Sequence, residues 1–203
     1  MNNDFFEYEN KYRLKGYNFI AGVDEAGRGP LAGPVYAAAV VFDEGVYIEG
    51  VNDSKKLSEK KREYLFDEII AKARCYNIFS VDEKTIDEIN ILNATYKAFE
   101  GAVSSLNPRC DFALIDGNRA GNMPVDFETV VKGDALSFSI AAASILAKVS
   151  RDRYIVELDK LYPEYGFKKH KGYGTKEHLE AICKFGPCPI HRLSFRGVKQ
   201  YVR

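Results

Sequence analysis

The sequence predicts an α/β fold in which a mixed β-sheet is flanked by helices and followed by a small helical and loop-rich region at the C-terminus. Two strand-like runs lie close together near the N-terminus, which indicates a hairpin. Helical and strand-like patterns then alternate along the chain. No repeat, low-complexity tract or Pro/Gly/Ser-rich linker divides the 203 residues, so we expect one large domain with an appendage.

The predicted hairpin joins a strand at residues 18–23 to a strand at 35–42 through the turn sequence GRGPLAGP at 27–34. Ser58 then precedes a helical pattern at 59–73. Its hydroxyl can accept a hydrogen bond from a backbone N–H of the first turn, which makes it a good helix N-cap.

The rest of the chain alternates between strands and helices. We expect strands at 75–82, 110–117 and 127–134, a helix at 89–106 that stops before Pro108, and a long helix from residue 135 that ends at Pro163. Beyond Pro163 the chain is loop-rich with one short helix near 177–184. We therefore divide it into a domain at 1–164 and a C-terminal region at 165–203 that packs on the domain.

The overall composition excludes a disordered tail and a membrane protein, because 46% of the residues are hydrophobic and 29% are charged. The longest apolar run, Val35 to Phe42, is far shorter than the roughly 20 residues that a spanning helix needs. The N-terminus has no basic, apolar or cleavage segment typical of a leader. We expect a cytoplasmic monomer with no membrane partner.

The four cysteines indicate neither zinc nor a disulfide. Cys75 and Cys110 lie in apolar runs and are expected in the core. Cys183, Cys188 and His191 lie close together, but a structural zinc site needs four ligands with paired spacing, and no second pair is near.

Four acidic residues lie where predicted strands or turns end: Asp24, Glu25, Asp116 and Asp134. α/β folds usually place their chemistry at strand ends. Converging carboxylates repel one another unless cations are bound, and Mg²⁺ and Mn²⁺ prefer such oxygen ligands. A pair of these ions can hold the attacking water and the leaving oxygen of a phosphodiester. Each acidic residue taken alone is more simply a turn former.

Asp24 and Glu25 present a geometric difficulty. Neighbouring residues of a regular strand point to opposite faces, so both side chains cannot face one site. We therefore expect the strand to bend or end at Glu25, which Gly27 and Gly29 make possible.

The segment GRGPLA at 27–32 matches the dinucleotide-binding pattern G-x-G-x-x-G/A. That motif opens a helix, whereas Pro30 and Gly33-Pro34 lead into a strand here. We therefore expect no nicotinamide, flavin or other organic cofactor. Gly27 and Gly29 instead allow a ligand to approach the backbone closely.

Five motifs together resemble the bacterial ribonuclease HII family, the type 2 ribonucleases H: DEAGRGPLAGPV at 24–35, IDGN at 115–118, KGD at 132–134, AAASILAKVSRD at 141–152 and KGYGTKEH at 171–178. The resemblance runs from about residue 18 to 198. It implies a ribonuclease H-like mixed sheet with a small C-terminal helical region. It also implies an endoribonuclease that uses Mg²⁺ or Mn²⁺ to nick RNA–DNA hybrids and DNA duplexes containing ribonucleotides. Cleavage 5′ to the ribonucleotide would leave 3′-hydroxyl and 5′-phosphate ends.

The resemblance also implies roles for particular residues. The four acidic residues match the family's catalytic, metal-binding carboxylates: Asp24, Glu25, Asp116 and Asp134. Gly27, Arg28 and Gly29 match the loop that senses the ribose 2′-hydroxyl, the group that distinguishes RNA from DNA. Tyr173 matches the tyrosine that packs on the neighbouring deoxyribose and disfavours an added hydroxyl there.

Other residues have two interpretations. Ser54 and Lys55 match a family segment near the substrate backbone, although a solvated helix N-terminus explains them equally well. Lys148 and Arg151 could contact phosphates or pair with nearby acids, and Asp152 is expected to be structural. His178 either positions the KGYGT turn or lies on the surface.

Two other functions are weighed against this one. A carboxylate nuclease of the resolvase or transposase type is disfavoured by the GRG loop with Tyr173. A non-catalytic module that binds RNA–DNA hybrids would be marked by the loss of a carboxylate, and all four are present.

The charges are unevenly distributed. The chain has 29 basic and 29 acidic residues, but residues 165–203 carry nine basic and two acidic side chains. We expect this basic tail to bind the phosphate backbone of a nucleic acid through residues interleaved with Tyr173 and Phe195. The basic residues of the tail include Lys168, Lys169, Lys171, Lys176, Arg192 and Arg196.

Overall fold

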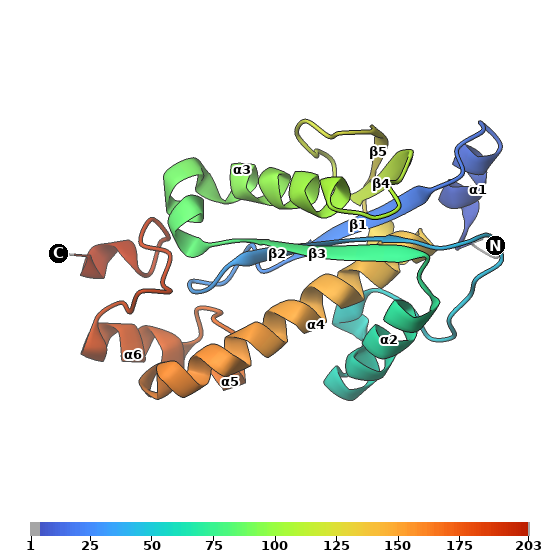
Figure 1. Ribbon diagram of the computed structural model, residues 1–203. Helices are drawn as coiled ribbons and strands as arrows, with labels where there is room; N and C mark the ends of the chain where they lie inside the picture. Colours follow the sequence, from blue (N-terminus) through green and yellow to red (C-terminus); the bar gives the residue numbers. More distant parts are fainter. Residues whose placement is uncertain (1–4, 203) are drawn as a thin grey trace.

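The computed structural model describes residues 5–202 and confirms the predicted mixed β-sheet flanked by helices (Figure 1). The five strands lie in the order β3-β2-β1-β4-β5. They are β1 (Ile20–Ala26), β2 (Val35–Val41), β3 (Cys75–Val81), β4 (Phe112–Asp116) and β5 (Asp126–Val130). β1, β2 and β3 form an antiparallel meander that contains the predicted hairpin, whereas β4 and β5 run parallel to β1.

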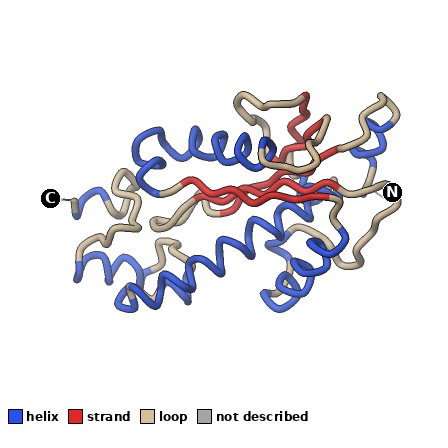
Figure 2. The backbone as a smooth tube through the Cα atoms, in the orientation of Figure 1, coloured by secondary structure: helices blue, strands red, loops and turns tan. Residues whose placement is uncertain are grey.

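Helices cover both faces of the sheet (Figure 2). α3 (Glu83–Ser104) packs on one face, and α4 (Phe138–Leu161) packs with α2 (Glu59–Lys72) on the other. α1 (Glu7–Arg13) lies against the starts of β1 and β4. The C-terminal region contains α5 (Phe167–His170) and α6 (Lys176–Phe185). Single 3₁₀ turns lie at Ser54–Lys56, Gly133–Ala135, Pro163–Tyr165 and Lys199–Tyr201.

Small residues in the central strands let the helices approach the sheet closely. Ala37 and Ala39 of β2 pack toward α3, while Ala38 packs toward α4 and α2. At Gly22 of β1, an added Cβ would lie 2.0 Å from the carbonyl carbon of Ser139 in α4. The first turn of α4 therefore rests directly on the backbone of β1.

α3 begins earlier than the predicted start at residue 89. Asp82 caps the helix at Glu83, because its side chain accepts a hydrogen bond from Thr85 N at 2.8 Å. Asn90, with φ of 66°, interrupts the helix, and its side chain accepts the N–H groups of residues 92 and 93. The sequence pattern therefore detected only the second of two helical segments.

The boundaries before α4 also differ from the prediction. The strand expected to reach residue 134 ends at Val130, because Lys132 adopts a left-handed conformation with φ of 59°. α4 starts at Phe138 rather than 135, after the side chain of Ser137 caps it. The sequence pattern does not predict α1, which Tyr12 anchors by stacking on Phe112 at a centroid distance of 3.7 Å.

The C-terminal region shares a buried cluster with the end of α4 and with the segment after the glycine loop. Its members are Leu31, Ala32, Ile155, Leu158, Tyr165, Phe167, Ala181, Ile182, Cys188, Ile190 and Val198. The backbone continues this contact, since Leu31 N donates to Gly172 O at 2.8 Å and Gly33 N donates to Ile190 O at 2.8 Å. The tail is thus packed against the predicted turn at 27–34.

All four cysteines are free, and Cys75 and Cys110 are buried. Cys183 is exposed on α6, whereas Cys188 is buried. Within residues 5–202, no helix combines the length and apolar character needed to cross a membrane.

Candidate active site

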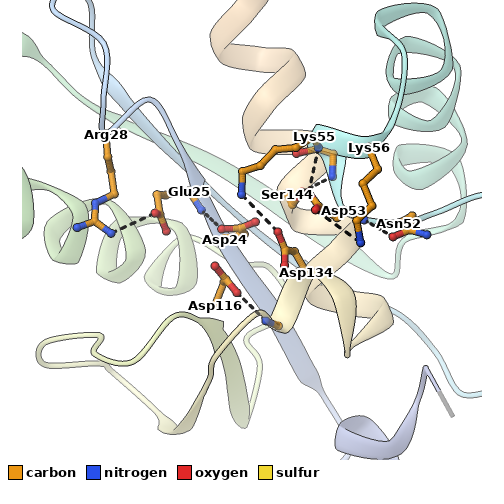
Figure 3. A network of polar contacts seen from close by, with 12 residues as sticks. Asp24, Glu25, Arg28, Asn52, Asp53, Lys55, Lys56, Asp116, Asp134 and Ser144 are labelled. Atoms are coloured by element: carbon orange, nitrogen blue, oxygen red, sulfur yellow. Dashed lines mark hydrogen bonds and ion pairs between the residues drawn. The ribbon is translucent and has the colours of Figure 1, made fainter. Parts of the chain in front are cut away.

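The four acidic residues singled out by the sequence come from three neighbouring elements (Figure 3). Asp24 and Glu25 lie near the end of β1, and Asp116 is the last residue of β4. Asp134 lies in the 3₁₀ turn before α4. Because β1 and β4 are parallel neighbours, their C-terminal ends meet at one edge of the sheet. The fold therefore gathers these four residues at that edge.

The expectation that the strand bends or ends at Glu25 is wrong. β1 pairs with β2 without a break to its last residue, with Asp24 opposite Ala38 and Glu25 opposite Ala37. Ala38 faces α4 and Ala37 faces α3, so the two carboxylates leave opposite faces of the sheet. Both still border one cleft, because β4 pairs with β1 only as far as Val23 and leaves the edge of β1 open beyond it.

Two of the carboxylates accept hydrogen bonds from the backbone. Asp24 Oδ1 lies 2.6 Å from Glu25 N, and Asp116 Oδ1 lies 2.7 Å from Gly133 N. The second contact joins the end of β4 to the turn that carries Asp134. It therefore fixes the spacing between two of the three elements that form the site.

The other two carboxylates face cations. Lys55 Nζ lies 3.5 Å from Asp134 Oδ2, and Arg28 Nη1 lies 3.5 Å from Glu25 Oε1. The Lys55 side chain is 79% exposed and that of Arg28 is 49% exposed. Long pairs of this kind in contact with water contribute little free energy, so they compensate the negative charge weakly.

Burial and the repulsion of neighbouring charges disfavour ionisation of Asp24, Glu25 and Asp134. Burial first, and then the charges of Glu25 and Asp116, raises the pKa of Asp24 well above its usual value. Burial also raises the pKa of Glu25, with Arg28 acting in the opposite direction. The pKa of Asp134 is raised by burial and then by Asp116. The site therefore holds more negative charge than its own cations neutralise.

This donor set fits a hard divalent cation. Carboxylate oxygens are the ligands that Mg²⁺ and Mn²⁺ prefer, and a cation would relieve the repulsion among them. As the side chains stand, no three His, Cys, Asp or Glu residues within 5–202 are grouped so as to hold a metal ion. Each carboxylate is turned instead to the donor described above, and binding an ion requires it to exchange that donor for the ion.

A cleft of about 200 Å³ contains most of the residues predicted from the sequence. Its lining consists of Asp24, Glu25, Ala26, Gly27, Arg28, Gly29, Ser54, Lys55, Asp116, Lys148 and Tyr173. Asp134 is absent from this lining and contacts it through Lys55. Larger cavities of about 430 Å³ between α2 and α4, and about 820 Å³ beside α6, are lined by none of the predicted site residues.

The glycine loop and Tyr173 form one wall of this cleft. Gly27 has φ of +97°, a conformation that favours glycine. A Cβ at Gly27 would lie 2.1 Å from Arg151 Nε, and a Cβ at Gly29 would lie 3.5 Å from Tyr173 Cε1. The Tyr173 ring thus faces Gly29 across a space that a methyl group would just fill, and at 45% exposure it remains open to a ligand.

The weaker candidates differ in their surroundings. Ser54 is buried, and its backbone N–H donates to a serine of α4. Lys148 Nζ lies 2.8 Å from Asp152 Oδ1 and 6.0 Å from the centre of the Tyr173 ring. The interpretation of Asp152 as the partner of a helix residue therefore agrees with the structure, and Lys148 reaches both an acid and the cleft.

Arg192 and Arg151 do not lie where they are expected from the sequence. Arg192, expected among the phosphate-binding residues of the tail, is 0% exposed, and Arg151 is 1% exposed. Both donate to backbone carbonyls in the interior, so neither can reach a phosphate. A count of charges treats every guanidinium as a surface group, which is why it misplaces Arg192. Among the described residues, Arg151 does not pair with a nearby acid either, which was its alternative. The exposed basic residues of the tail include Lys168, Lys169, Lys176 and Arg196, while Lys171 is half-buried.

His178 is buried and supports the turn that carries Tyr173. Its Nδ1 lies 2.9 Å from Tyr173 O, which can only accept, so Nδ1 carries the proton. Its Nε2 lies 3.0 Å from His191 Nε2, so His191 must donate there and accept from Cys188 N, 2.9 Å from its Nδ1. Both rings are therefore neutral with defined tautomers, and burial first lowers the pKa of each to about 4.

Sequence reasoning missed one acidic residue near the site. The side chain of Asp53 accepts a hydrogen bond from Lys55 N at 2.9 Å and so caps the 3₁₀ turn at 54–56. Its charge also contributes to the raised pKa of Asp134. An aspartate just before a Ser-Lys-Lys run is a typical N-cap signal and could have revealed it.

The chain is similar in sequence to one protein family over most of its length. Residues 21–198 match the family model described as ribonuclease HII. A ribonuclease HII of Caldicellulosiruptor bescii is 59% identical over 192 residues, which cover 95% of this chain and 93% of the relative. That of Ruminiclostridium cellulolyticum is 60% identical over 195 residues, covering 96% of this chain and 76% of the relative.

Solved structures share the fold. The ribonuclease H2 of Pyrococcus horikoshii has a TM-score of 0.75 and 31% identity, covering 90% of this chain and 96% of its own. The RNase HII in a PCNA:RNase HII complex from Archaeoglobus fulgidus has a TM-score of 0.73 and 26% identity, covering 88% and 95%. A Bst-RNase HIII solved with Mn²⁺ has a TM-score of 0.69 and 17% identity, covering 91% and 69%.

Proposed function

The chain belongs to the ribonuclease HII family, and on that premise we propose that the cleft at the ends of β1 and β4 is its active site. The protein is an endoribonuclease of the ribonuclease H type, a phosphodiester hydrolase. We propose that it nicks RNA–DNA hybrids and DNA duplexes with embedded ribonucleotides on the 5′ side of the ribonucleotide. The products would be 3′-hydroxyl and 5′-phosphate ends.

The observation that carries this proposal is the carboxylate set at the edge of the sheet. Burial and repulsion within that set raise the pKa of Asp24, Glu25 and Asp134, which a divalent cation would counteract. These three residues and Asp116 would hold Mg²⁺ or Mn²⁺. Two such ions, when bound, supply Lewis acidity and lower the pKa of an attacking water.

The protein's own groups orient the substrate. The Gly27–Gly29 loop brings backbone amides to the cleft, where they can hydrogen-bond to a ribose 2′-hydroxyl, a group that deoxyribose lacks. The Tyr173 ring, which lines the same cleft as Gly29, would pack on the adjacent sugar. A junction of ribose followed by deoxyribose would therefore fit best along this wall.

Basic groups around the cleft would bind the phosphate backbone. Lys55 and Lys148 line it, and Arg28 reaches it from the loop. We propose residues 1–164 as the catalytic domain and residues 165–203 as a substrate-binding region. The exposed lysines of that region provide non-specific, salt-dependent affinity.

We propose that the protein acts as a monomer in the cytoplasm. The archaeal relative found in a PCNA:RNase HII complex makes a clamp protein a partner worth testing. A non-catalytic hybrid-binding module and a resolvase-type nuclease are less consistent with this chain, since family membership and all four carboxylates favour ribonucleotide cleavage.

A nicking assay on a DNA duplex with one embedded ribonucleotide tests the proposal. We expect cleavage 5′ to the ribonucleotide only with Mg²⁺ or Mn²⁺, and at least about a hundredfold loss in Asp116→Asn. Asp67→Asn, which changes an exposed aspartate of α2, is the matched control and should cleave normally. Equal cutting of an all-DNA duplex would contradict the proposal.

A further inference from the structure

Arg151 and Arg192 are among the largest fully buried side chains of the molecule. Within residues 5–202, neither forms an ion pair with a carboxylate, and their guanidinium donors meet backbone carbonyls instead. Burying a charge in this way is costly, and burial lowers the pKa of Arg151 to about 10 and that of Arg192 to about 9. Both remain protonated near neutral pH.

The Arg192 guanidinium binds four carbonyls of the glycine loop and the segment after it. Nη2 donates to Gly27 O at 2.6 Å, and Nη1 donates to Arg28 O at 3.0 Å and Pro30 O at 2.8 Å. Nε donates to Gly33 O at 2.9 Å. A planar group with five donors in fixed directions can hold several carbonyls at once, which a single ammonium group cannot do with the same geometry.

Arg151 links the same loop to the turn that carries Tyr173. Nε donates to Pro34 O at 3.1 Å, Nη2 to Ala32 O at 3.0 Å, and Nη1 to Lys171 O at 3.0 Å. Its side chain also fills the space beside Gly27, where a Cβ would clash. One buried side chain therefore joins the segment after the glycine loop to the turn that carries Tyr173.

These contacts determine which way the loop amides face. In a trans peptide the C=O and the following N–H point in opposite directions. Since the carbonyls of Gly27 and Arg28 point inward to Arg192, the N–H groups of Arg28 and Gly29 point away from it. Among the described residues, neither N–H donates to a protein group, and both residues line the cleft.

We propose that Arg192 is a positioning residue for ribonucleotide recognition, acting through the peptide groups of the glycine loop with Arg151 in support. This inference rests on the proposed function of the cleft and goes beyond it, because Arg192 never touches substrate. Arg192 holds two amide donors toward the ribose 2′-hydroxyl. Loosening it misaligns those donors while leaving the carboxylates and the phosphate-binding lysines in place.

Arg192→Lys tests the proposal, because it keeps the positive charge and loses the planar group with five donors in fixed directions. On the duplex with one ribonucleotide, we expect kcat to fall about tenfold to a hundredfold, as misplacement of a positioning group does, with KM changed less than about threefold. The metal-induced rise in melting temperature should persist. A kcat within about twofold of wild type would overturn the proposal.

A second variant covers the case in which Arg192→Lys does not fold. The Arg192 guanidinium lies 5.0 Å from the centre of the half-buried Phe195 ring, so Phe195→Leu should loosen the arginine while preserving an apolar side chain. We expect a smaller loss of kcat in the same direction, about threefold to tenfold. An unchanged kcat in this variant would count against the proposal.

Ile182→Val is the matched control for lost stability. Ile182 belongs to the same buried C-terminal cluster, but its apolar side chain donates no hydrogen bond to the loop carbonyls described above. We expect it to lower the melting temperature without changing kcat; a loss of kcat that follows stability alike in all three variants would mean that Arg192 is merely structural. If wild type fails to cut the embedded ribonucleotide, the proposed function itself fails, which is a separate outcome.

Discussion

The two sides of the cleft handle buried polar groups in opposite ways. We call one side the carboxylate cluster, which comprises Asp24, Glu25, Asp116 and Asp134. We call the other the loop support, which comprises Arg151, His178, His191 and Arg192. The carboxylate cluster brings like charges together with weak surface cations as partners. The loop support is buried more deeply, but its donors and acceptors meet complementary groups.

The carboxylate cluster is therefore suited to binding a cation, and the loop support is suited to holding the loop in one conformation. Repulsion left in the carboxylate cluster is free energy that a cation can relieve on binding. A fully satisfied network, by contrast, stabilises one conformation, since any rearrangement leaves a buried donor or acceptor unpaired. Variants of the two sides should therefore change stability in different directions.

The largest expected effect is that of Asp24→Asn, which removes one charge and keeps an oxygen to accept the Glu25 N–H. Cleavage at an embedded ribonucleotide should fall at least about a hundredfold, because losing even an outer partner of a metal ligand costs up to that much. The metal-free variant should nevertheless resist urea better than wild type, since repulsion by Glu25 and Asp116 ends. A variant less stable than wild type would contradict the inference that repulsion destabilises the metal-free carboxylate cluster.

Gly27→Ala tests the loop support by steric conflict. Gly45 serves as the control, because its φ of +80° resembles the +97° of Gly27 but nothing lies within 4 Å of an added Cβ. Gly45→Ala should cost about 1–2 kcal/mol for the left-handed conformation alone. Gly27→Ala should cost about 2–5 kcal/mol, because its Cβ also collides with Arg151. Equal losses in urea unfolding would show that the loop can move away from Arg151.

Because of the two histidines of the loop support, we expect the folded protein to lose stability in acid. Burial lowers the pKa of His178 and His191 to about 4, whereas an unfolded histidine titrates near 6.5. Between these values the unfolded chain binds more protons, so stability is complete above about pH 6.5 and falls as the pH is lowered toward 4. The slope should be about 1.4 kcal/mol per pH unit for one such histidine.

Carboxylates titrate in the same pH range. The quantity to compare is therefore the difference in free energy of unfolding between wild type and a variant without the two histidines. Urea unfolding of wild type and of a His178→Gln, His191→Gln double variant at pH 7, 6 and 5 would isolate the histidine contribution. We expect the gap in stability between the two proteins to narrow as the pH falls. A constant gap would mean that the two rings are not held neutral in the folded protein.

Tyr173→Ala should have the smallest effect. The ring is 45% exposed and belongs to none of the buried clusters, so the fold should persist. Cleavage at a ribose–deoxyribose junction should fall by about fivefold, as expected for an aromatic contact of ~1 kcal/mol. Tyr64→Ala, at an exposed tyrosine of α2, is the matched control. Unchanged kinetics for Tyr173→Ala would show that this ring does not contribute to recognition of the junction.

Local patterns predicted much of the fold. The apolar run of β2 and the capped start of α2 were identified because burial on both faces and a Ser58 N-cap leave marks within a few neighbouring residues. The acidic strand ends were identified in the same way, and the structure gathers them at one edge of the sheet. The kink at Asn90 and the helix α1 were not predicted, because backbone conformation and docking at those points depend on packing with distant residues.

The sequence by itself therefore determined the succession of the five strands along the chain, the placing of acidic residues at strand ends and turns, and the family. Only the tertiary structure decided which face each carboxylate takes and which cations are buried. Arg192 shows the reason: the carbonyls that it binds lie between 159 and 165 positions earlier in the chain. Whether a guanidinium meets water or a buried carbonyl depends on contacts over that separation, which no local pattern of residues records.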